Sequence, residues 1–470
     1  MTPDHPIPGT APAAAVNHGG ADPARIAKLA AKAGRDYAAA RPKTRKALRD
    51  QATDWLNGVP MHWMSDWPQP FPMLVTHAEG ATIHDLDGHR IDDFCLGDTG
   101  AMFGHAPAPV VKAIRAQSRC GLATMLPTPD ALHVGPALTR RFGKMRWQIA
   151  TTATDANRFA LRVARAVTGK PKVLVFNGCY HGTVDDAMVT LGPDGQTVPR
   201  PGLIGQVADL SQTAVVIEFN DIPALRAALE AGDVAAVLTE PVMTNSCMVL
   251  PDAGFHDGLR KLTREHGALL IIDETHSQSS GLGGYTRVHS LSPDILVVGK
   301  CVAGGMPAAV WGLTPAVAAR LADYEATRPP GHSGMGTTLS GNPMQMACLR
   351  ATLERVATKA AFARMEAGAA RLETGLVAAI RRHKAPWHVV RIGARVEFIC
   401  APHRLKNGAE AAMAHAPALE ACVHAMLLNR GCLIAPFHNM MLVSPVTTNA
   451  QIDRLIAAFD ATLAAIFKDK

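Results

Sequence analysis

GALLIIDETHSQSSGLGGYTRVHSLSPDILVVGK, residues 267–300, contains two continuous apolar runs that are each followed by a residue able to do chemistry. The first run, residues 268–272, is followed by Asp273, and the second, residues 295–298, is followed after one glycine by Lys300. Short apolar runs without alternation are typical of strands that are buried on both faces of a parallel sheet. In such sheets ligands bind beyond the carboxyl ends of the strands. The residues that follow each run are therefore candidates for a ligand site.

The same pattern extends toward the N-terminus. Further apolar runs rich in β-branched residues occur at residues 172–176, 214–218 and 234–239. Segments of helical period lie between several of the runs, at residues 155–168 and 255–266. Strands that alternate with helices predict an α/β domain with a mostly parallel central sheet flanked by helices.

The two ends of the chain have a different pattern. Residues 81–94 have apolar alternation on both sides of Asp87-Gly88, which predicts a β-hairpin. Residues 25–56 have helical period, whereas the aromatic, proline-rich residues 61–72 cannot form a long helix. After Pro343 we expect long alanine-rich helices, interrupted by extended pieces near residues 394–400 and 432–444.

These patterns predict a second, smaller α+β domain that is assembled from both ends of the chain. The expected divisions are a frayed tail at 1–24, an N-terminal segment of the small domain at 25–105, the large domain at 106–345, and the C-terminal small domain at 346–470.

Composition argues against several classes of partner. The chain has 470 residues, of which 48% are hydrophobic and 19% charged, as in ordinary globular proteins. The formal net charge is +7, but acids are interleaved with the basic residues and only residues 41–49 form a basic cluster, so we expect no nucleic-acid partner. We also expect no membrane span. The nine cysteines lack CxxC spacing, which predicts no metal site and a cytoplasmic protein.

Three strand-end and helix-start positions fit one cofactor when they are taken together. Thr152-Ala153-Thr154 precedes the helix expected from Asp155, and a helix start can bind a phosphate. Singly, Asp273 could be a turn former, Lys300 a solvent-facing lysine and the threonines plain caps. Together they match pyridoxal 5'-phosphate (PLP), which needs a lysine for its Schiff base, a carboxylate for its pyridine nitrogen and an anion site for its phosphate.

Motifs along most of the chain, from about Phe71 to the C-terminus, resemble those of a known family. They are similar to the class III, or ω-type, PLP-dependent aminotransferases of fold type I, a group that includes glutamate-1-semialdehyde aminomutase. The motifs are DLDGHRIDDF from Asp85, GHAPAPV from Gly104, RVARAVTGKPKVLVFNGCYHG from Arg162, TEPV from Thr239, DET from Asp273, SPDILVVGKCVAGGMPAA from Ser292 and GTTLSGNP from Gly336.

The resemblance implies a role for each matching residue around the cofactor ring. Lys300 would form the Schiff base and Asp273 would pair with the pyridine N–H. Thr275 takes the place of a valine that usually packs against one ring face. Tyr180 matches the aromatic residue of the other face, with a buried core tyrosine as the alternative, and His181 beside it joins the cofactor-binding set.

The remaining matches concern cofactor contacts further from the ring centre. Glu240 matches the family's Glu-Pro after a central strand, with a structural ion pair as the alternative. Thr152, Ala153 and Thr154 stand where the family has Ser-Gly-Thr, and a β-carbon in place of glycine predicts reshaped phosphate contacts. Thr338 matches a threonine that reaches the neighbouring subunit's phosphate, so the resemblance implies a homodimer. Its alternative is a cap for the helix that opens at Pro343.

Residues for substrate binding are less well marked. The positions where relatives acting on β-amino acids carry carboxylate-binding arginines align with His62 and Phe437, so no arginine is carried over. Trp63, His276 and Arg395 are candidate substrate-binding residues. The alternatives are a core or interface role for Trp63, support of Asp273 by His276, and an exposed or ion-paired Arg395.

We expect a PLP-dependent aminotransferase that moves an amino group from an ω- or β-amino acid, or another primary amine, to a keto acid such as pyruvate or 2-oxoglutarate. The alternative is an isomerase on the same scaffold, either an aminomutase of the glutamate-1-semialdehyde type or a racemase. A cofactor-binding protein without turnover is disfavoured by the intact Lys300 and Asp273.

Overall fold

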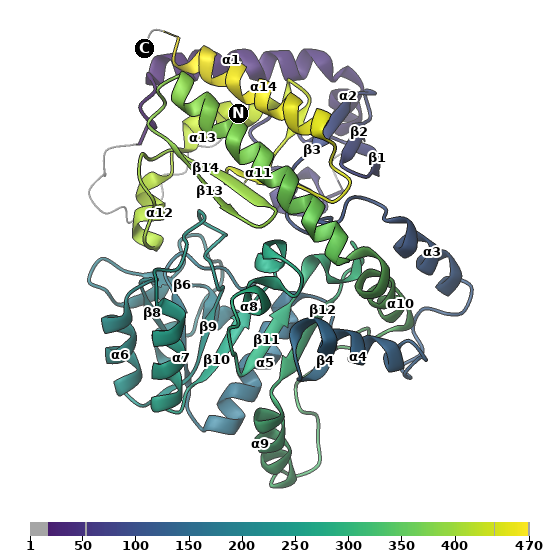
Figure 1. Cartoon of the computed structure of the whole chain (residues 1–470), viewed down its shortest axis with the longest axis vertical. Helices are drawn as coiled ribbons and strands as arrows, with labels where there is room; N and C mark the ends of the chain where they lie inside the picture. Colours follow the sequence, from purple (N-terminus) through teal and green to yellow (C-terminus); the bar gives the residue numbers. More distant parts are fainter. Residues whose placement is uncertain (1–16, 52–53, 437, 469–470) are drawn as a thin grey trace.

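The computed structural model describes residues 17–51, 54–436 and 438–468 (Figure 1). Its largest sheet has seven strands in the order β4-β12-β11-β10-β9-β5-β8. Their bounds are β4 (Arg146–Ala150), β5 (Lys172–Phe176), β8 (Ala214–Ile217), β9 (Val234–Thr239), β10 (Leu269–Asp273), β11 (Ile295–Val298) and β12 (Ala309–Leu313).

The five strands predicted from apolar runs form a continuous parallel block from β11 to β8. The sequence pattern missed β4 and β12, which complete the sheet on one side. β12 runs antiparallel to both β11 and β4. β4, at the edge, is partly exposed along most of its length, so it lacks the continuous apolar run of a central strand.

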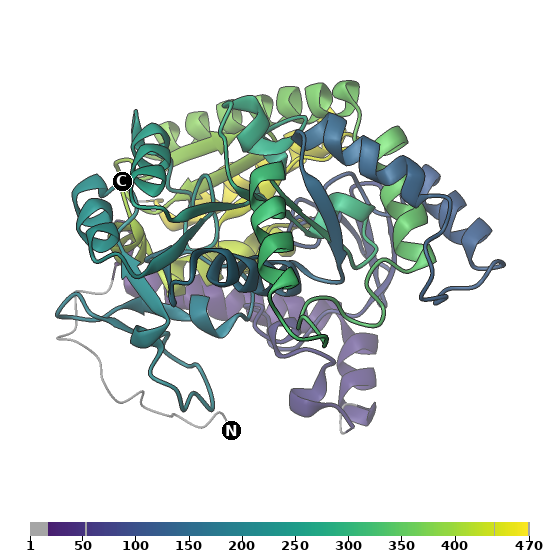
Figure 2. The same ribbon diagram turned by 90° about the horizontal axis from the view of Figure 1, so that it is seen from below.

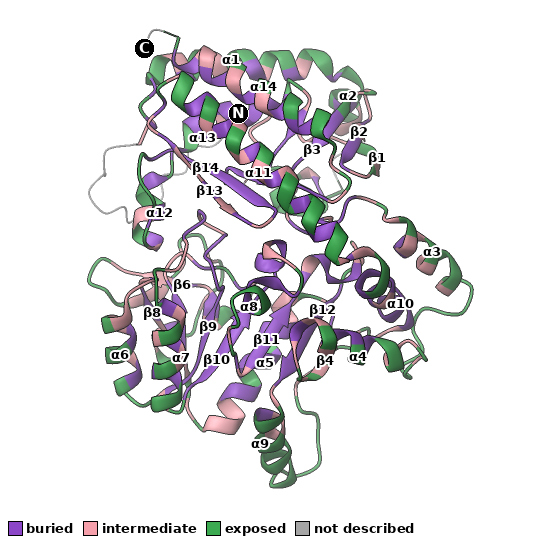
Figure 3. Cartoon of the chain, in the orientation of Figure 1, coloured by how far each residue is buried: buried purple, intermediate pink, exposed green. Residues whose placement is uncertain are grey.

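Helices cover both faces of this sheet (Figure 2). Side chains of β5 alternate between two cores, because Leu174 and Phe176 pack with α7 (Phe255–Glu265) whereas Val173 and Val175 pack with α5 (Ala153–Thr168). Figure 3 shows the central strands buried and the outer helix faces exposed. This arrangement is the mostly parallel, doubly covered sheet that the sequence predicted.

A smaller α+β unit is built from both ends of the chain, as expected. The hairpin of β2 (Thr82–Asp85) and β3 (Arg90–Asp93) forms as predicted, and β3 then pairs in parallel with β15 (Cys432–Leu433). α1 (Pro23–Ala40) packs on α13 (Pro417–Leu428). The predicted domain boundaries themselves stay predictions.

The remaining elements have these bounds: α2 (Pro42–Gln51), β1 (Val75–Glu79), α3 (Ala108–Gln117), α4 (Ala131–Phe142), β6 (Val189–Leu191), β7 (Thr197–Pro199), α6 (Ile222–Glu230), α8 (Gly284–Val288), α9 (Pro315–Ala326), α10 (Pro343–Ala351), α11 (Lys359–Arg382), β13 (His388–Ile392), β14 (Arg395–Ile399), α12 (Gly408–Ala414), β16 (Met440–Leu442) and α14 (Asn449–Ile466). Across the described part of the chain no single helix meets the length and apolarity needed to cross a bilayer, although the bent pair α12 and α13 meets them jointly.

A frayed tail was expected at residues 1–24, of which residues 1–16 lie outside the described residues. From residue 17 onward the expectation is wrong, because the segment is held by hydrogen bonds. Asn17 donates to the Ala414 carbonyl at 2.8 Å, and the Trp387 indole donates to the Gly19 carbonyl at 2.8 Å. The helical stretch expected at 25–56 divides at Pro42 into α1 and α2.

Candidate active site

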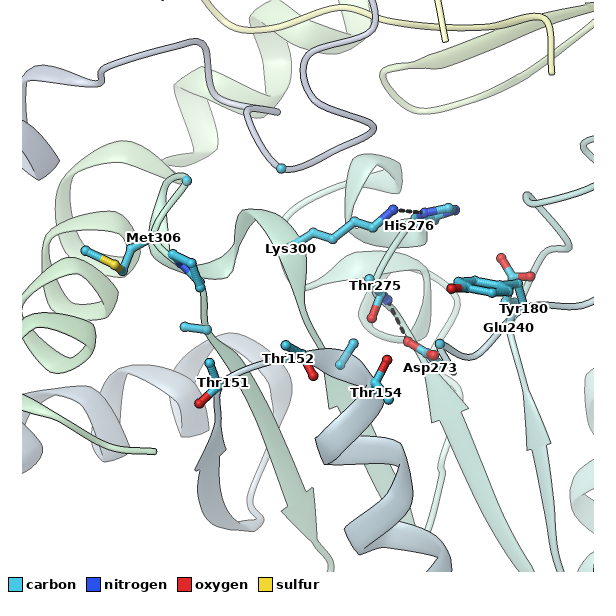
Figure 4. Close-up of a pocket in the computed structure, with 16 residues that line it drawn as sticks. Thr151, Thr152, Thr154, Tyr180, Glu240, Asp273, Thr275, His276, Lys300 and Met306 are labelled. Carbon is cyan, nitrogen blue, oxygen red and sulfur yellow. Dashed lines mark hydrogen bonds between the residues drawn. The ribbon is translucent and has the colours of Figure 1, made fainter. Parts of the chain in front are cut away.

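A cavity of about 380 Å³ opens at the carboxyl ends of the central strands (Figure 4). It brings together residues that the sequence predicted as a site from distant segments. These residues are Thr152, Ala153, Thr154, Tyr180, Glu240, Asp273, Thr275, His276 and Lys300. Residues that the sequence reasoning missed also line it, namely Gly100, Thr151, Gly182, Gly305, Met306, Pro307 and Ala308.

Lys300 stands at the end of β11 and projects its amine into the cavity. Its Nζ lies 2.5 Å from Asp98 Oδ2 and 2.5 Å from His276 Nε2. The backbone φ of Lys300 is +50°, a left-handed conformation that costs a residue with a side chain about 1 kcal/mol or more and recurs at functional sites. The lysine is therefore held in place from both its backbone and its amine.

Asp273 is buried at the end of β10, and its carboxylate is fixed by three neighbours. Oδ2 accepts a hydrogen bond from Asn157 Nδ2 at 2.8 Å and lies 3.1 Å from His181 Nδ1, while Oδ1 accepts from the Thr275 N–H at 3.0 Å. Burial alone would raise the pKa of Asp273, but the hydrogen bond and charge of His181 outweigh it and lower the pKa. Asp273 is accordingly a buried anion that faces the cavity.

His181 lies behind Asp273 in this arrangement. Burial would lower its pKa, but Cys179 and Asp273 outweigh that effect and raise the pKa to about 10. A protonated His181 keeps the Asp273 carboxylate ionised. A carboxylate in that state can hold the protonated nitrogen of a pyridine ring.

The start of α5 forms one end of the cavity. Thr152 caps the helix, since its Oγ1 accepts from the Asp155 N–H at 3.1 Å. The N–H groups of Ala153 and Thr154 are among those that an α-helix leaves without an internal partner. Ala153 is the first residue of α5, so it has a helical backbone that accommodates a β-carbon without strain. The Ala153 Cβ faces Gly299. A Cβ added at Gly299 would lie only 2.8 Å from the Ala153 Cβ.

Tyr180, Glu240 and Thr275 line the cavity around its centre. Tyr180 is 37% exposed and is therefore not the buried core tyrosine of the alternative interpretation. Glu240 is buried and bonds to the neutral Thr244 hydroxyl, so the alternative of a structural ion pair is wrong for the described residues. Glu240 Oε1 and Thr275 Oγ1 have no hydrogen-bond partner in the part of the chain that the structure describes. Both atoms can contact a polar ligand.

His276 occupies a different position from the one in its alternative interpretation. It does not bond to Asp273, because its Nε2 faces Lys300 and its Nδ1 lies 2.8 Å from Thr244 Oγ1. Burial, followed by the charge of Lys300, lowers the pKa of His276 to about 4. The ring is thus neutral at pH 7 and can accept a hydrogen bond from the lysine amine.

Trp63 and Thr338 are two of the four predicted residues that do not line the cavity; the other two are His181 and Arg395. Trp63 is 42% exposed in a short 3₁₀ turn, His62–Met64. Thr338 lines a separate cavity of about 590 Å³ together with Met125 and Leu126. The alternative of a helix cap at Thr338 is wrong, since Asn342 caps α10.

Arg395 lies behind His276 and does not line the cavity either. It is neither exposed nor ion-paired in the described residues, because it donates to Thr99 Oγ1 at 2.6 Å and to the His276 carbonyl at 3.3 Å. Burial lowers its pKa. Of the two aligned arginine positions, His62 lies near Asp66, and Phe437 falls outside the described residues.

Asp98, which contacts Lys300, is another residue that sequence reasoning missed. It follows no strand of the large sheet, but lies in a loop where Leu96, Gly97, Asp98 and Thr99 have φ of +48°, +59°, +46° and +81°. Burial would raise the pKa of Asp98, but Lys300 and His276 outweigh it and hold the pKa well below its usual value. Only the fold brings this carboxylate to Lys300.

The residues present fit PLP. The cavity offers a lysine amine, a buried anion, a helix start and an aromatic ring, together with oxygens of Thr151, Glu240 and Thr275 that have no partner among the described residues. Fold and cavity together define a fold type I enzyme that uses PLP. The model of the class-III aminotransferase family matches residues 63–463, and the chain belongs to this family. The resemblance inferred from its motifs is confirmed.

Individual relatives are similar over most of the chain. Glutamate-1-semialdehyde 2,1-aminomutase of Roseiflexus castenholzii is 33% identical over 400 residues, 84% of this chain and 91% of that protein. The crystal structure of a glutamate-1-semialdehyde aminomutase from Pseudomonas aeruginosa PAO1 is 47% identical with a TM-score of 0.93, covering 95% of this chain and 100% of that one. A variant of that enzyme was solved in complex with PMP.

An ω-transaminase from Sphaerobacter thermophilus is more distant, with 27% identity and a TM-score of 0.81 over 90% of this chain and 97% of that one. The expected transfer of an amino group to pyruvate or 2-oxoglutarate is therefore corrected. The similar proteins at 33% and 47% identity are aminomutases, which are isomerases, and they favour the alternative interpretation.

Proposed function

We propose that this protein is a PLP-dependent aminomutase that moves an amino group between neighbouring carbons of one substrate, as the name glutamate-1-semialdehyde 2,1-aminomutase describes. The observation that carries the proposal is the 47% identity to an aminomutase over 95% of the chain, against 27% to an ω-transaminase. The cavity supplies the residues that such a rearrangement needs.

When bound, PLP supplies a carbonyl carbon that bonds to amines and a ring that draws electrons from the adjacent carbon. Lys300 would hold the group covalently and, once released, carry protons on one face of the ring. Asp273, kept anionic by His181, would hold the ring nitrogen protonated. The N–H groups at the start of α5 would bind the phosphate. Tyr180 and Thr275 would confine the ring.

Movement of the amino group within one molecule requires the same lysine to serve two neighbouring carbons. A single base in a fixed position could do so if the substrate brings each carbon within its reach in turn. Lys300 has one amine held between Asp98 and His276, which fixes its position at the cavity centre.

The test is to supply the PLP-loaded protein with glutamate 1-semialdehyde and no keto acid. We expect the isomer with its amino group on carbon 1, detected by NMR as loss of the aldehyde proton without any change in molecular mass. Lys300→Ala is the control and should form no product. Conversion that occurs only after pyruvate or 2-oxoglutarate is added would contradict the proposal.

We also propose that the protein is a homodimer, with Thr338 close to the second copy's cavity. Large apolar side chains gather beside Thr338 on the surface, since Met125 is 81% exposed, Leu126 71% and Leu339 54%. Exposed apolar side chains in one place are typical of an interface. Light scattering should give twice the mass of one chain, and Met125→Glu with Leu126→Glu should give a single-chain mass.

A further inference from the structure

A continuous line of hydrogen-bonding groups joins Lys300 to Glu240, another residue of the cavity wall. Lys300 Nζ lies 2.5 Å from His276 Nε2, and His276 Nδ1 lies 2.8 Å from Thr244 Oγ1. The Thr244 hydroxyl in turn donates to Glu240 Oε2. Figure 4 shows Lys300 and His276 pointing toward each other. Nothing in cofactor binding requires His276 and Thr244 to be joined in this way.

The directions of these bonds are consistent from one end to the other. If Nε2 of a neutral His276 accepts from the lysine, Nδ1 carries the hydrogen and donates to Thr244. Thr244 then has its own hydrogen free to donate to Glu240. Both His276 and Glu240 are buried side chains of the cavity wall. His276 and Thr244 therefore each accept one hydrogen bond and donate the next, which is the order that proton transfer needs.

Charged groups from other elements face this line. Asp98, from the loop after β3, contacts Lys300, while Arg395, from β14, contacts the His276 carbonyl. Asp273 and His181 act on Glu240 through their charges. Asp98 contacts the lysine amine directly, whereas the line through His276 and Thr244 joins that amine to Glu240.

We propose that His276, Thr244 and Glu240 form a proton relay that takes up and returns the proton of the Lys300 amine during catalysis. The relay serves the part of the cycle in which Lys300 is released, because its Nζ must then both gain and lose a proton. The inference rests on the proposed function only in assigning Lys300 as the covalent lysine.

The transfer is balanced in protons. The Nζ–H bond of protonated Lys300 breaks as an Nε2–H bond forms on His276, and the Nδ1 hydrogen passes to Thr244 Oγ1. The original hydroxyl hydrogen of Thr244 bonds to Glu240 Oε2. The products are a neutral lysine, a neutral His276 with its hydrogen on Nε2, an intact threonine and a protonated Glu240. Burial raises the pKa of Glu240, which favours its protonation.

The experiment displaces Lys300 from the cofactor in the PLP-loaded protein with hydroxylamine and follows the cofactor absorbance as a function of pH. Thr244→Val removes the hydroxyl and keeps the shape, whereas Thr244→Ser keeps the hydroxyl. Glu240→Gln removes the terminal acceptor, and it serves if Thr244→Val fails to fold. Thr263→Val is the matched control, a buried threonine in α7 that bonds to the Leu259 carbonyl.

We expect Thr244→Val and Glu240→Gln to slow displacement about 10-fold at pH 7, and to raise the pH of half-maximal rate by about one unit. Thr244→Ser should restore most of the rate and the original pH profile. Unchanged pH profiles in both Thr244→Val and Glu240→Gln, as in Thr263→Val, would overturn the relay. Hydroxylamine displacement needs no isomerisation, so failure of the aminomutase proposal would leave this result intact.

Discussion

At the scale of single residues, the buried carboxylate of Asp273 is expected to hold the ring nitrogen of the cofactor. Asp273→Asn keeps the shape but removes the charge that His181 and Asn157 support. We expect kcat to fall about 100- to 1000-fold, as when one preorganised electrostatic group is removed from an active site. The measurement is isomerisation rate at matched PLP occupancy. Wild-type rates in Asp273→Asn would contradict this role.

A second prediction at this scale concerns pH and stability. Burial lowers the pKa of His424, in α13, to about 4. The unfolded chain binds a proton there below about pH 6.5, which the folded chain does not bind until about pH 4. His424 therefore makes stability fall as the pH drops through that window, by up to about 1.4 kcal/mol per pH unit. In urea titrations His424→Gln should weaken this pH dependence, and equal slopes would show that the prediction is wrong.

Site residues could be predicted from the sequence where they directly follow a strand of the large sheet, but not where they lie in other loops. Asp273 and Lys300 follow apolar strands, so the rule of strand ends found them without the fold. Asp98 sits in a left-handed loop with no strand of the sheet before it, and its partner Lys300 is 202 residues away. Trp63 was expected near the substrate from its residue type alone, and the structure leaves it at the surface.

At the scale of elements, the loop at Gly182 lies close to the start of α5. This contact shapes the end of the cavity where the phosphate would bind. A Cβ at Gly182 would overlap Thr154 Oγ1, and its φ of +79° also disfavours a side chain. Gly182→Ala should weaken PLP binding about 10-fold, measured by absorbance titration. Gly195→Ala is the matched control, because Gly195 has a φ of +75° with open space around it. Equal affinities in the two variants would exclude the steric explanation.

The same scale shows what periodicity could predict. Continuous apolar runs gave the five parallel strands, since those strands are buried on both faces. β4 mixes Arg146 and Gln148 with apolar residues because its burial varies along an edge. An apolar run therefore does not predict the edge strand β4, and it does not predict that β12 is antiparallel. Such features come from pairing between distant segments.

At the scale of the whole molecule, both chain ends depend on one aromatic cluster. Phe459 of α14 packs on Phe398 of β14, with ring centroids 5.0 Å apart, and on Trp387, which also binds Gly19. Phe459→Ala should lower the free energy of unfolding by about 3–5 kcal/mol, measured in urea. The exposed Leu132→Ala should change it by less than about 0.5 kcal/mol. Comparable losses in the two variants would contradict a shared core.

The central claim for the whole molecule is that Lys300 carries the cofactor. The most direct measurement is borohydride reduction of the PLP-loaded protein, followed by peptide mass spectrometry. We predict a single reduced pyridoxyl phosphate adduct, on the peptide that contains Lys300, and its loss in Lys300→Ala. An adduct on another lysine, or none in a protein that binds PLP, would contradict the account.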